Sequence, residues 1–309
     1  MPSVSYSSKA GQPLIRQLAD RPGSIVGIDA GGSCTRAVLV ESGLVVKSMV
    51  AGPMNALLTE RFEEGLSEIV AALGGTSLGI GMPGLRCEED AVRLGAAMEA
   101  RTGCRTRAAS DVEVARLGAF MGSAGIVVVA GTGSVAAGWN GTASARAGGH
   151  GFLLGDEGGA YWLGNQAVRS MLRALDAGNR SPLAEAALAV MPPGVDVRDG
   201  LEDLVRKVYH HATNRHLLAD LAPMVTGMAA TDPECRQICE RAADHLASLA
   251  EVVRGRLGRL PVAAVGGVFE AAAIRDRFLK LTSATQPLAP PSIGAALLAP
   301  RAWTAGDRK

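Results

Sequence analysis

The sequence has no marked excess of charge of either sign and few aromatic side chains. Its 309 residues include 31 Lys and Arg against 30 Asp and Glu, for a formal net charge of +1, and only 4% are aromatic. A chain so close to neutral has no overall electrostatic attraction for nucleic acid or for an anionic membrane surface. We therefore expect neither as a partner.

Cysteine and long apolar runs are also scarce. Five cysteines, an odd number spread through a long chain, argue against a disulfide framework and for a reducing compartment. No apolar run approaches the roughly 18 residues that a transmembrane helix needs, and the first residues do not have the charged-then-apolar pattern of a signal peptide. The expected location is the cytoplasm.

Several common nucleotide-binding signatures are missing. No Lys follows a Gly, so there is no P-loop, and neither a His-Arg-Asp nor an Asp-Phe-Gly protein-kinase motif occurs. The two hairpin turns, at 31–33 and 131–134, also lack the Gly-x-Gly-x-x-Gly spacing that opens a dinucleotide-binding unit. With 48% hydrophobic residues, the chain has enough material for one large or two ordinary domains.

The most informative stretch is 25–40, where two apolar, β-branched runs flank a Gly-Gly-Ser turn. This pattern predicts a β-hairpin, and a tip with so few side chains lets backbone N–H groups approach an anion closely. The donors would be the backbone of Gly31, Gly32 and Ser33 together with the hydroxyls of Ser33 and Thr35. Asp29 beside them could hold Mg²⁺, directly or through water. An ordinary glycine-rich hairpin with a solvated Asp is the alternative at this point.

The second half of the chain opens as the first does. An apolar strand at 126–130 leads into Gly131, Thr132, Gly133 and Ser134, and strands at 135–139 and 144–147 follow. Two halves that each carry a glycine-rich hairpin with hydroxyls would face each other across a cleft. The duplication makes a phosphate-binding role for both turns stronger than either turn does alone.

Elsewhere the pattern alternates short strands with amphipathic helices, which is typical of an α/β protein with strands of mixed direction. In the first half we expect helices at 60–73, 88–101 and 111–121 and strands at 77–80 and 106–109. After a mostly helical stretch, 158–257, come a strand at 262–265 and helices at 270–281 and 292–298. The expected domains are an extension, 1–23, a domain at 24–121 and a domain at 122–290, with 291–299 packing back on the first domain.

Four motifs occur in one order along the chain. They are Asp-Ala-Gly-Gly-Ser-Cys-Thr at 29–35, Gly-Thr-Gly-Ser at 131–134, a segment with Gly-Asp-Glu-Gly at its centre at 151–164, and Ala-Val-Gly-Gly-Val at 264–268. Over 25–299 the chain resembles the N-acetylglucosamine kinase and BadF/BadG-type ATPase family of the sugar kinase–Hsp70–actin superfamily. The resemblance implies an α/β fold of two actin-like (ribonuclease H-like) domains, with mixed sheets flanked by helices and with ATP and sugar in the interdomain cleft.

The resemblance also assigns roles to residues. Asp111 follows a strand and opens a helix after Ser110, so the residues by themselves favour N-terminal capping, whereas the resemblance implies that Asp111 is the catalytic base. Implied ATP-binding residues are Gly31, Gly32, Ser33, Thr35, Thr132, Gly133, Ser134, Gly266 and Gly267, with Asp29 for Mg²⁺. Implied sugar-binding residues are Asn55, Asp111, Gly151, Asp156 and Glu157, and for Glu157 a structural role is the alternative.

Three positions depart from the family's usual pattern. Ser33 stands where Thr is usual and keeps a hydroxyl, and Cys34 occupies a position that tolerates variety, so neither change threatens ATP binding. Pro83, where relatives often have a small residue, puts the local sugar contact in doubt.

The activity that the resemblance implies is an ATP- and Mg²⁺-dependent hexosamine kinase, acting on the 6-hydroxyl of N-acetylglucosamine, in a homodimer. Glucosamine is the alternative within this class, and N-acetylmuramic acid is also open. A different class is an ATPase switch that activates a partner enzyme, as in the dehydratase activators that hold an iron–sulfur cluster between subunits. Cys235 and Cys239 have helical spacing but different flanking sequence, and we interpret them as helix thiols.

Overall fold

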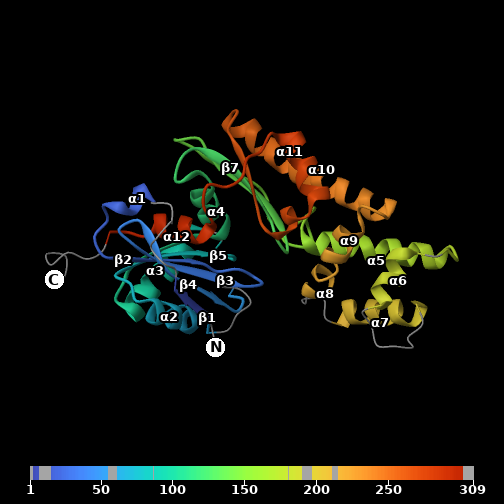
Figure 1. Cartoon of the computed structure of the whole chain (residues 1–309), viewed down its shortest axis with the longest axis horizontal. Coiled ribbons are helices and arrows are strands. Elements are labelled where there is room, and N and C mark those ends of the chain that lie inside the picture. Colours follow the sequence, from blue (N-terminus) through green and yellow to red (C-terminus); the bar gives the residue numbers. More distant parts are fainter. Residues whose placement is uncertain are drawn as a thin grey trace. The chain divides into compact units, whose positions relative to one another are not determined.

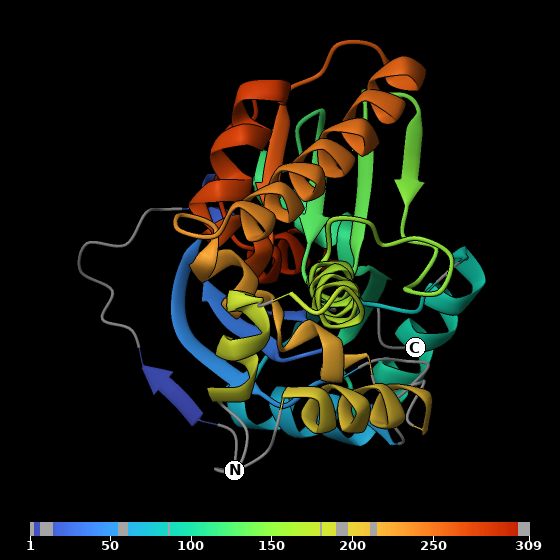
Figure 2. The same cartoon turned by 90° about the vertical axis from the view of Figure 1, so that its right-hand side faces the viewer.

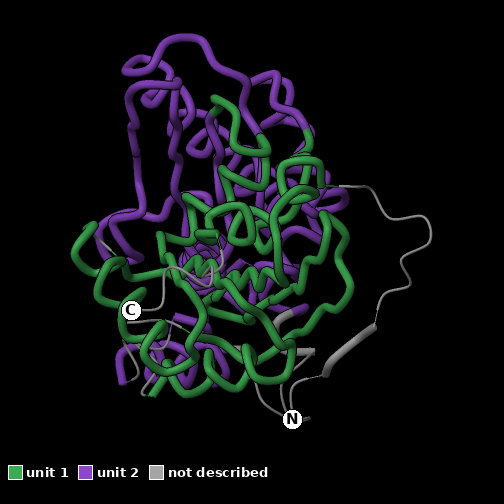
Figure 3. The backbone as a smooth tube through the Cα atoms, turned by 90° about the vertical axis from the view of Figure 1, so that its left-hand side faces the viewer, with its two compact units in different colours: residues 1–125, 286–309 green, residues 126–285 purple. Residues whose placement is uncertain are grey.

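The computed structural model divides into two compact units, which Figure 3 colours separately. Unit 1 comprises Met1–Gly125 and Gln286–Lys309, and unit 2 comprises Ile126–Thr285. The residues that the structure describes are 3–6, 15–54, 61–85, 87–179, 181–189, 197–210 and 215–301. The chain thus leaves unit 1 once and returns to it, so that its last helix belongs with its first strands.

Unit 1 is built on a six-stranded mixed sheet with the order β1-β4-β3-β2-β5-β6. The strands are β1 (Ser3–Tyr6), β2 (Ser24–Asp29), β3 (Thr35–Glu41), β4 (Leu44–Ala51), β5 (Ser77–Met82) and β6 (Arg105–Ser110). The meander β2-β3-β4 is antiparallel, whereas β5 pairs parallel to β2 and β6 parallel to β5. The expected mixed α/β architecture is confirmed. Strand β1, which pairs antiparallel with β4, is an element that the sequence patterns did not predict.

Helices cover both faces of this sheet (Figure 1). They are α1 (Arg16–Ala19), α2 (Phe62–Leu73), α3 (Glu88–Thr102), α4 (Asp111–Phe120) and α12 (Pro291–Leu298). Side chains alternate along a strand, so Val26 and Ile28 of β2 join the core beneath α2 and α3, whereas Ile25 faces the opposite way, into the core beneath α12. Both faces of β2 are therefore buried, which explains its nearly unbroken apolar run.

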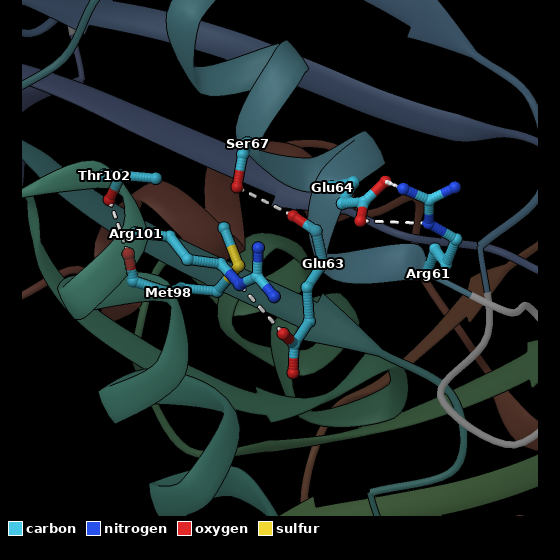
Figure 4. A network of polar contacts seen from close by, with 7 residues as sticks. All are labelled: Arg61, Glu63, Glu64, Ser67, Met98, Arg101 and Thr102. Atoms are coloured by element: carbon cyan, nitrogen blue, oxygen red, sulfur yellow. Dashed lines mark hydrogen bonds and ion pairs between the residues drawn. The ribbon is translucent and has the colours of Figure 1, made fainter.

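A polar contact joins α2 to α3 on the outside of unit 1 (Figure 4). The Arg101 guanidinium donates to Glu63 at 2.9 Å, and within α2 the Ser67 hydroxyl donates to the carbonyl of Glu63 at 2.8 Å. Both partners of the ion pair are partly solvated, so its contribution to stability is at most about 1 kcal/mol. The apolar core beneath the two helices is the larger source of stability.

Helix α12 lies against the sheet and α4 because glycines leave room for it. A Cβ on Gly27 would meet the backbone of α12 at Ala296, and a Cβ on Gly79 would meet it at Ala295. A Cβ on Gly294, within α12 itself, would collide with the carbonyl oxygen of Val114 in α4. These contacts bring backbone against backbone, which any larger residue would prevent.

Unit 2 holds a four-stranded sheet with the order β10-β7-β8-β9. Its strands are β7 (Gly125–Ala130), β8 (Ser134–Trp139), β9 (Ser144–Gly148) and β10 (Val262–Val265). Strand β10 is parallel to β7, and β9 is antiparallel to β8, so this sheet is also mixed.

The helices of unit 2 are α5 (Ala160–Asp176), α6 (Pro182–Ala189), α7 (Val197–His210), α8 (His216–Ala219), α9 (Ala222–Met228), α10 (Pro233–Leu257) and α11 (Ala272–Thr282). The helix expected at 270–281 begins instead with a 3-10 turn, η1 (Gly267–Glu270), before α11. The long helix α10 packs across β8 and β9 (Figure 2) and beside α11. Among the described residues, no helix is long and apolar enough to cross a membrane.

We predict that Gly294→Ala lowers the free energy of unfolding by about 1–3 kcal/mol, because the new methyl group overpacks the crossing of α12 and α4. Gly255→Ala is the matched control, since Gly255 also lies in a helix but a Cβ there would meet no atom within 4 Å. The control should be neutral or stabilising by up to about 1 kcal/mol. Urea titrations followed by circular dichroism measure both changes, and a Gly294→Ala protein as stable as wild type would contradict the close crossing.

Candidate active site

Two carboxylates lie at one edge of the unit 1 sheet. Asp29 ends β2 opposite Gly81 of the parallel neighbour β5, and Gly81 lies opposite Ala109 of β6. Asp111 comes two residues after Ala109, at the start of α4. The carboxyl ends of parallel strands meet at one edge of a sheet, so strand register alone brings Asp29 and Asp111 into the same region.

Asp29 and Asp111 influence each other electrostatically. The pKa of Asp29 is raised to about 7, first because burial disfavours the carboxylate and second because the negative charge of Asp111 repels it. The positive charge of Arg36 acts in the opposite direction on the same pKa. Arg36 faces Asp29 across the hairpin. The sequence analysis did not single out Arg36, although the symmetry of the hairpin about its turn could have identified it.

The first glycine turn connects β2 to β3 beside these carboxylates. Its carbonyl at Gly31 accepts a hydrogen bond from the N–H of Met54 at 3.0 Å, and the N–H of Ala30 donates to Gly81 at 2.8 Å. At the far end of the turn, Thr35 is fully buried, yet its hydroxyl has no hydrogen-bond partner among the described residues. A buried hydroxyl without a partner is costly, and a phosphate or a metal-bound water would satisfy it.

At the start of α4, the residue that caps the helix is Ser110 and not Asp111. Ser110 is the N-cap residue, and its hydroxyl accepts a hydrogen bond from the N–H of Glu113 at 3.3 Å. The carboxylate of Asp111 accepts a hydrogen bond from the adjacent N–H of Val112 at 2.9 Å. Because Ser110 already caps the helix, capping does not account for a carboxylate at position 111. The helix dipole stabilises its ionised form there.

In unit 2 the second glycine turn lies next to the predicted adenosine motif. The turn follows β7 directly, and Gly266 follows β10, the parallel neighbour of β7. Gly266 has φ of +112°, and a Cβ there would collide with the carbonyl of Ala130 at the end of β7. Gly266 and Gly267 are exposed, so their bare backbone is open to a ligand beside the turn.

The Gly-Asp-Glu-Gly segment is hydrogen-bonded along the second turn. The N–H groups of Ala160 and Tyr161 donate to the carbonyls of Gly131 and Thr132, at 2.8 and 3.0 Å. In the other direction, the Ser134 hydroxyl donates to the carbonyl of Glu157 at 2.7 Å. The two motifs, some twenty residues apart in sequence, therefore form one local structure.

Asp156 and Glu157 differ sharply in exposure. Asp156 is only 5% exposed, and its carboxylate accepts hydrogen bonds from the backbone N–H groups of Ser134 and Gly151. Burial raises the pKa of Asp156 above its usual value, the charge of Glu157 adds to this, and the two N–H groups and the charge of Arg215 oppose it. Glu157 is exposed. The sequence analysis did not identify Arg215, and no motif around it would have done so.

The structure thus brings most of the predicted site residues together in two groups, one in each unit. The group in unit 1 holds Asp29, Gly31, Gly32, Ser33, Thr35 and Asp111, and the group in unit 2 holds Thr132, Gly133, Ser134, Gly151, Asp156, Glu157, Gly266 and Gly267. Asn55 lies outside the described residues. It follows Met54, whose N–H is bonded to the first turn.

The donor set fits Mg²⁺ bound together with a nucleotide. Within the described part of the chain, no three or more His, Cys, Asp and Glu side chains form a metal cage. Nucleotide-bound Mg²⁺ needs only one or two protein carboxylates, because phosphates and waters complete its shell. Asp29 and Asp111 beside a turn with an unpartnered Thr35 hydroxyl match that requirement.

Comparison with known protein families identifies the family to which this chain belongs. The model of the BadF/BadG/BcrA/BcrD ATPase family matches residues 26–299. The chain belongs to this family. The resemblance inferred from the four motifs is confirmed, and the family's name identifies ATP as the nucleotide that its members use.

Individual relatives agree with this membership. The chain is 27% identical over 274 residues to an N-acetylmuramic acid/N-acetylglucosamine kinase of Clostridium acetobutylicum, covering 79% of this chain and 85% of that protein. It is 28% identical over 313 aligned positions to an N-acetyl-D-glucosamine kinase of Dictyostelium discoideum, covering 89% and 97%. The crystal structure of a candidate N-acetylglucosamine kinase from Chromobacterium violaceum superposes with a TM-score of 0.75 at 26% identity, covering 89% of this chain and 98% of that one.

We predict that Asp29 makes the metal-free protein less stable as the pH rises. The folded protein keeps a proton on Asp29 up to about pH 7, whereas a carboxyl with the ordinary pKa of 3.8 releases it much earlier. The stabilisation by this group is therefore complete below about pH 4 and lost as the pH approaches 7, at about 1.4 kcal/mol per pH unit or less. In Asp29→Asn this pH dependence is absent.

Thermal melting in EDTA at pH 5 and pH 8 measures the effect. Asp29→Asn should melt at a higher temperature than wild type at pH 8, and the difference should shrink at pH 5. Asp20→Asn, at an exposed helix end of the same unit, is the control and should follow wild type. An equal difference between Asp29→Asn and wild type at both pH values would refute the assignment.

Proposed function

We propose that this protein is an ATP-dependent hexosamine kinase that transfers the γ-phosphoryl group of ATP to the 6-hydroxyl of N-acetylglucosamine. The observation that carries the proposal is the coupled pair Asp29 and Asp111 at the edge of the unit 1 sheet, beside a glycine turn with an unpartnered buried hydroxyl. Phosphoryl transfer to an alcohol needs a metal site, a phosphate cradle and a base close together. Unit 1 contains side chains suited to all three.

Asp111 is the proposed base, and it also binds the sugar. In this role it accepts the proton of the attacking hydroxyl as the new oxygen–phosphorus bond forms and the bond to ADP breaks. Its position in the first turn of α4 supports the role, since the helix dipole favours its ionised form. Ser110, and not Asp111, supplies the N-cap hydrogen bond of this helix.

Asp29 is the proposed residue for Mg²⁺, directly or through water. When bound, Mg²⁺ would neutralise charge on the phosphates of ATP. The proposed phosphate donors are the backbone and hydroxyls of the two turns, namely Gly31, Gly32, Ser33, Thr35, Thr132, Gly133 and Ser134. The exposed backbone at Gly266 and Gly267 is proposed to hold the adenosine.

The choice of a hexosamine rests on the relatives. Two relatives that cover most of this chain are kinases whose names include N-acetylglucosamine, and the Gly-Asp-Glu-Gly segment resembles that branch. Asn55, Gly151, Asp156 and Glu157 are the proposed residues of the sugar site besides Asp111. The exposed carboxylate of Glu157 is suited to a sugar hydroxyl. A homodimer is proposed from the family alone.

The alternative, an ATPase that switches a partner enzyme, finds little support in the thiols of α10. Cys235 and Cys239 are both fully buried, and burial raises their pKa values to about 12 and about 11. Metal clusters bind thiolates, and these thiols stay protonated and enclosed. They are core residues of unit 2.

We predict that the purified protein with Mg-ATP releases ADP when a hexosamine is added, and that Asp111→Asn lowers turnover by on the order of 10² or more, because the base is lost. The assay compares glucose, glucosamine, N-acetylglucosamine and N-acetylmuramic acid. NMR spectroscopy of the product identifies the hydroxyl group that carries the phosphate. Asp20→Asn replaces an exposed carboxylate of the same unit and should leave turnover unchanged.

The outcomes separate the two classes. Sugar-dependent ADP release that falls in Asp111→Asn supports the kinase, and the best substrate identifies its branch. ADP release that no sugar stimulates would point to the ATPase switch.

We also predict a magnesium phenotype for Asp29. Chelation by EDTA should abolish turnover, and Asp29→Asn should raise the Mg²⁺ concentration for half-maximal activity by roughly tenfold or more, because a neutral amide is a weaker ligand than a carboxylate. Titrating Mg²⁺ at fixed ATP measures this for both proteins. An unchanged Mg²⁺ requirement in Asp29→Asn would exclude Asp29 from the metal site.

A further inference from the structure

We propose that Asp156 is a positioning residue for the second phosphate turn, acting on nucleotide binding through the backbone of Gly133 and Ser134. This inference rests on the proposed function only in that the second turn binds a nucleotide phosphate. It assigns to Asp156 a role on the nucleotide side in addition to the sugar contact proposed above.

The first support is the position of the Asp156 carboxylate against the turn. A Cβ on Gly133 would collide with this carboxylate, so the side chain fills the space that any residue other than glycine would need. The N–H of Ser134 donates a hydrogen bond to Asp156. The carboxylate therefore contacts the turn at two successive residues, both of them candidate phosphate ligands.

The second support is how the rest of the segment is bound to the same turn. The backbone of Gly159 lies against Gly133, where a Cβ would collide with it. Ala160 and Tyr161 donate to the carbonyls of the turn, and Ser134 donates to Glu157. With Asp156 added, contacts come from both backbone and side chains along the whole length of the turn. A turn held this way presents its remaining N–H groups in one fixed arrangement.

The third support is the backbone at Asp156. Its φ of +63° lies in the left-handed region, which is unfavourable for a residue with a side chain. A glycine would adopt this conformation without strain, and glycines stand on either side at 155 and 158. Retaining a strained aspartate is understandable if its carboxylate performs a task that a glycine cannot.

The fourth support is Arg215, which precedes α8. Gly164 in α5 lets α8 come so close that a Cβ on Gly164 would collide with the carbonyl of Leu218. This contact places Arg215 near the segment that leads into α5, and its positive charge acts on Asp156. The Nε atom of Arg215 is buried and has no hydrogen-bond partner among the residues that the structure describes.

The nucleotide titration tests the positioning role of Asp156 by itself. An asparagine keeps the size of the side chain but has one acceptor oxygen, so its NH₂ group would face the N–H of Ser134 or of Gly151. If Asp156 positions the phosphate turn, nucleotide affinity falls even when no sugar is present. If Asp156 is a sugar ligand only, sugar affinity falls and nucleotide affinity stays.

Isothermal titration calorimetry on the full chain separates these cases. Mg-AMPPNP is titrated without sugar, and N-acetylglucosamine is titrated without nucleotide. We expect Asp156→Asn to weaken Mg-AMPPNP binding, measured without sugar, by roughly tenfold or more, whatever its effect on the sugar titration. Lost sugar affinity with unchanged nucleotide affinity would overturn the proposal. The nucleotide titration stays informative even if no hexosamine proves to be a substrate.

Asp232→Asn is the matched control in the same unit. Asp232 is also a buried aspartate that accepts a backbone hydrogen bond, from Cys235 at 2.8 Å, but it does so at the start of α10. We expect its Mg-AMPPNP affinity to equal that of wild type. Equal weakening in both variants would show a general loss of stability instead of a specific effect on the turn.

A second variant tests the pair if Asp156→Asn fails to fold. Burial and Glu157 raise the pKa of Asp156, and Arg215 and the two N–H groups lower it. Removing the charge in Arg215→Gln should therefore raise this pKa, so that Mg-AMPPNP affinity begins to fall at a higher pH than in wild type as the solution is acidified. Protonation of the nucleotide itself affects both proteins equally. Superimposable pH profiles of affinity would contradict a role of the Asp156 carboxylate in nucleotide binding.

Discussion

The parallel register of β2, β5 and β6 is the constraint on which the candidate site of unit 1 depends. It sets the carboxyl ends of three strands side by side and so brings together Asp29 and Asp111, which are 82 positions apart in the chain. Burial of Asp29, together with the repulsion between the two carboxylates, raises the pKa of Asp29. A divalent cation or a proton relieves this repulsion, which makes the site suited to metal-dependent phosphoryl transfer.

That register is itself held by close backbone packing. Gly27 and Gly79 sit on neighbouring strands and admit the backbone of α12, a helix from the far end of the chain. At Gly294 the same helix crosses α4, which begins with Asp111. Helix α12 therefore packs against β2, β5 and α4, the elements at whose ends the chemistry is proposed to occur.

In unit 2 the second glycine turn, 131–134, has few side chains of its own to hold it in place. The Gly-Asp-Glu-Gly segment supplies what the glycine turn lacks, a carboxylate at Asp156 and a series of backbone hydrogen bonds. Gly266 then brings the end of β10 against the end of β7 on the other side of the turn. The motifs of this unit are thus parts of one local structure.

The sequence by itself determined the α/β architecture, the order of nearly all elements and the family, because hydrophobic periodicity and glycine turns are local signals. It also placed Asp111 after a strand, although it could not separate capping from catalysis. Tertiary structure identified Ser110 as the cap, while catalysis by Asp111 stays a prediction. It also added β1, Arg36 and Arg215, whose roles depend on pairing and proximity. It alone showed that Asp156 is buried against the second turn, since burial follows from packing between segments that no local pattern encodes.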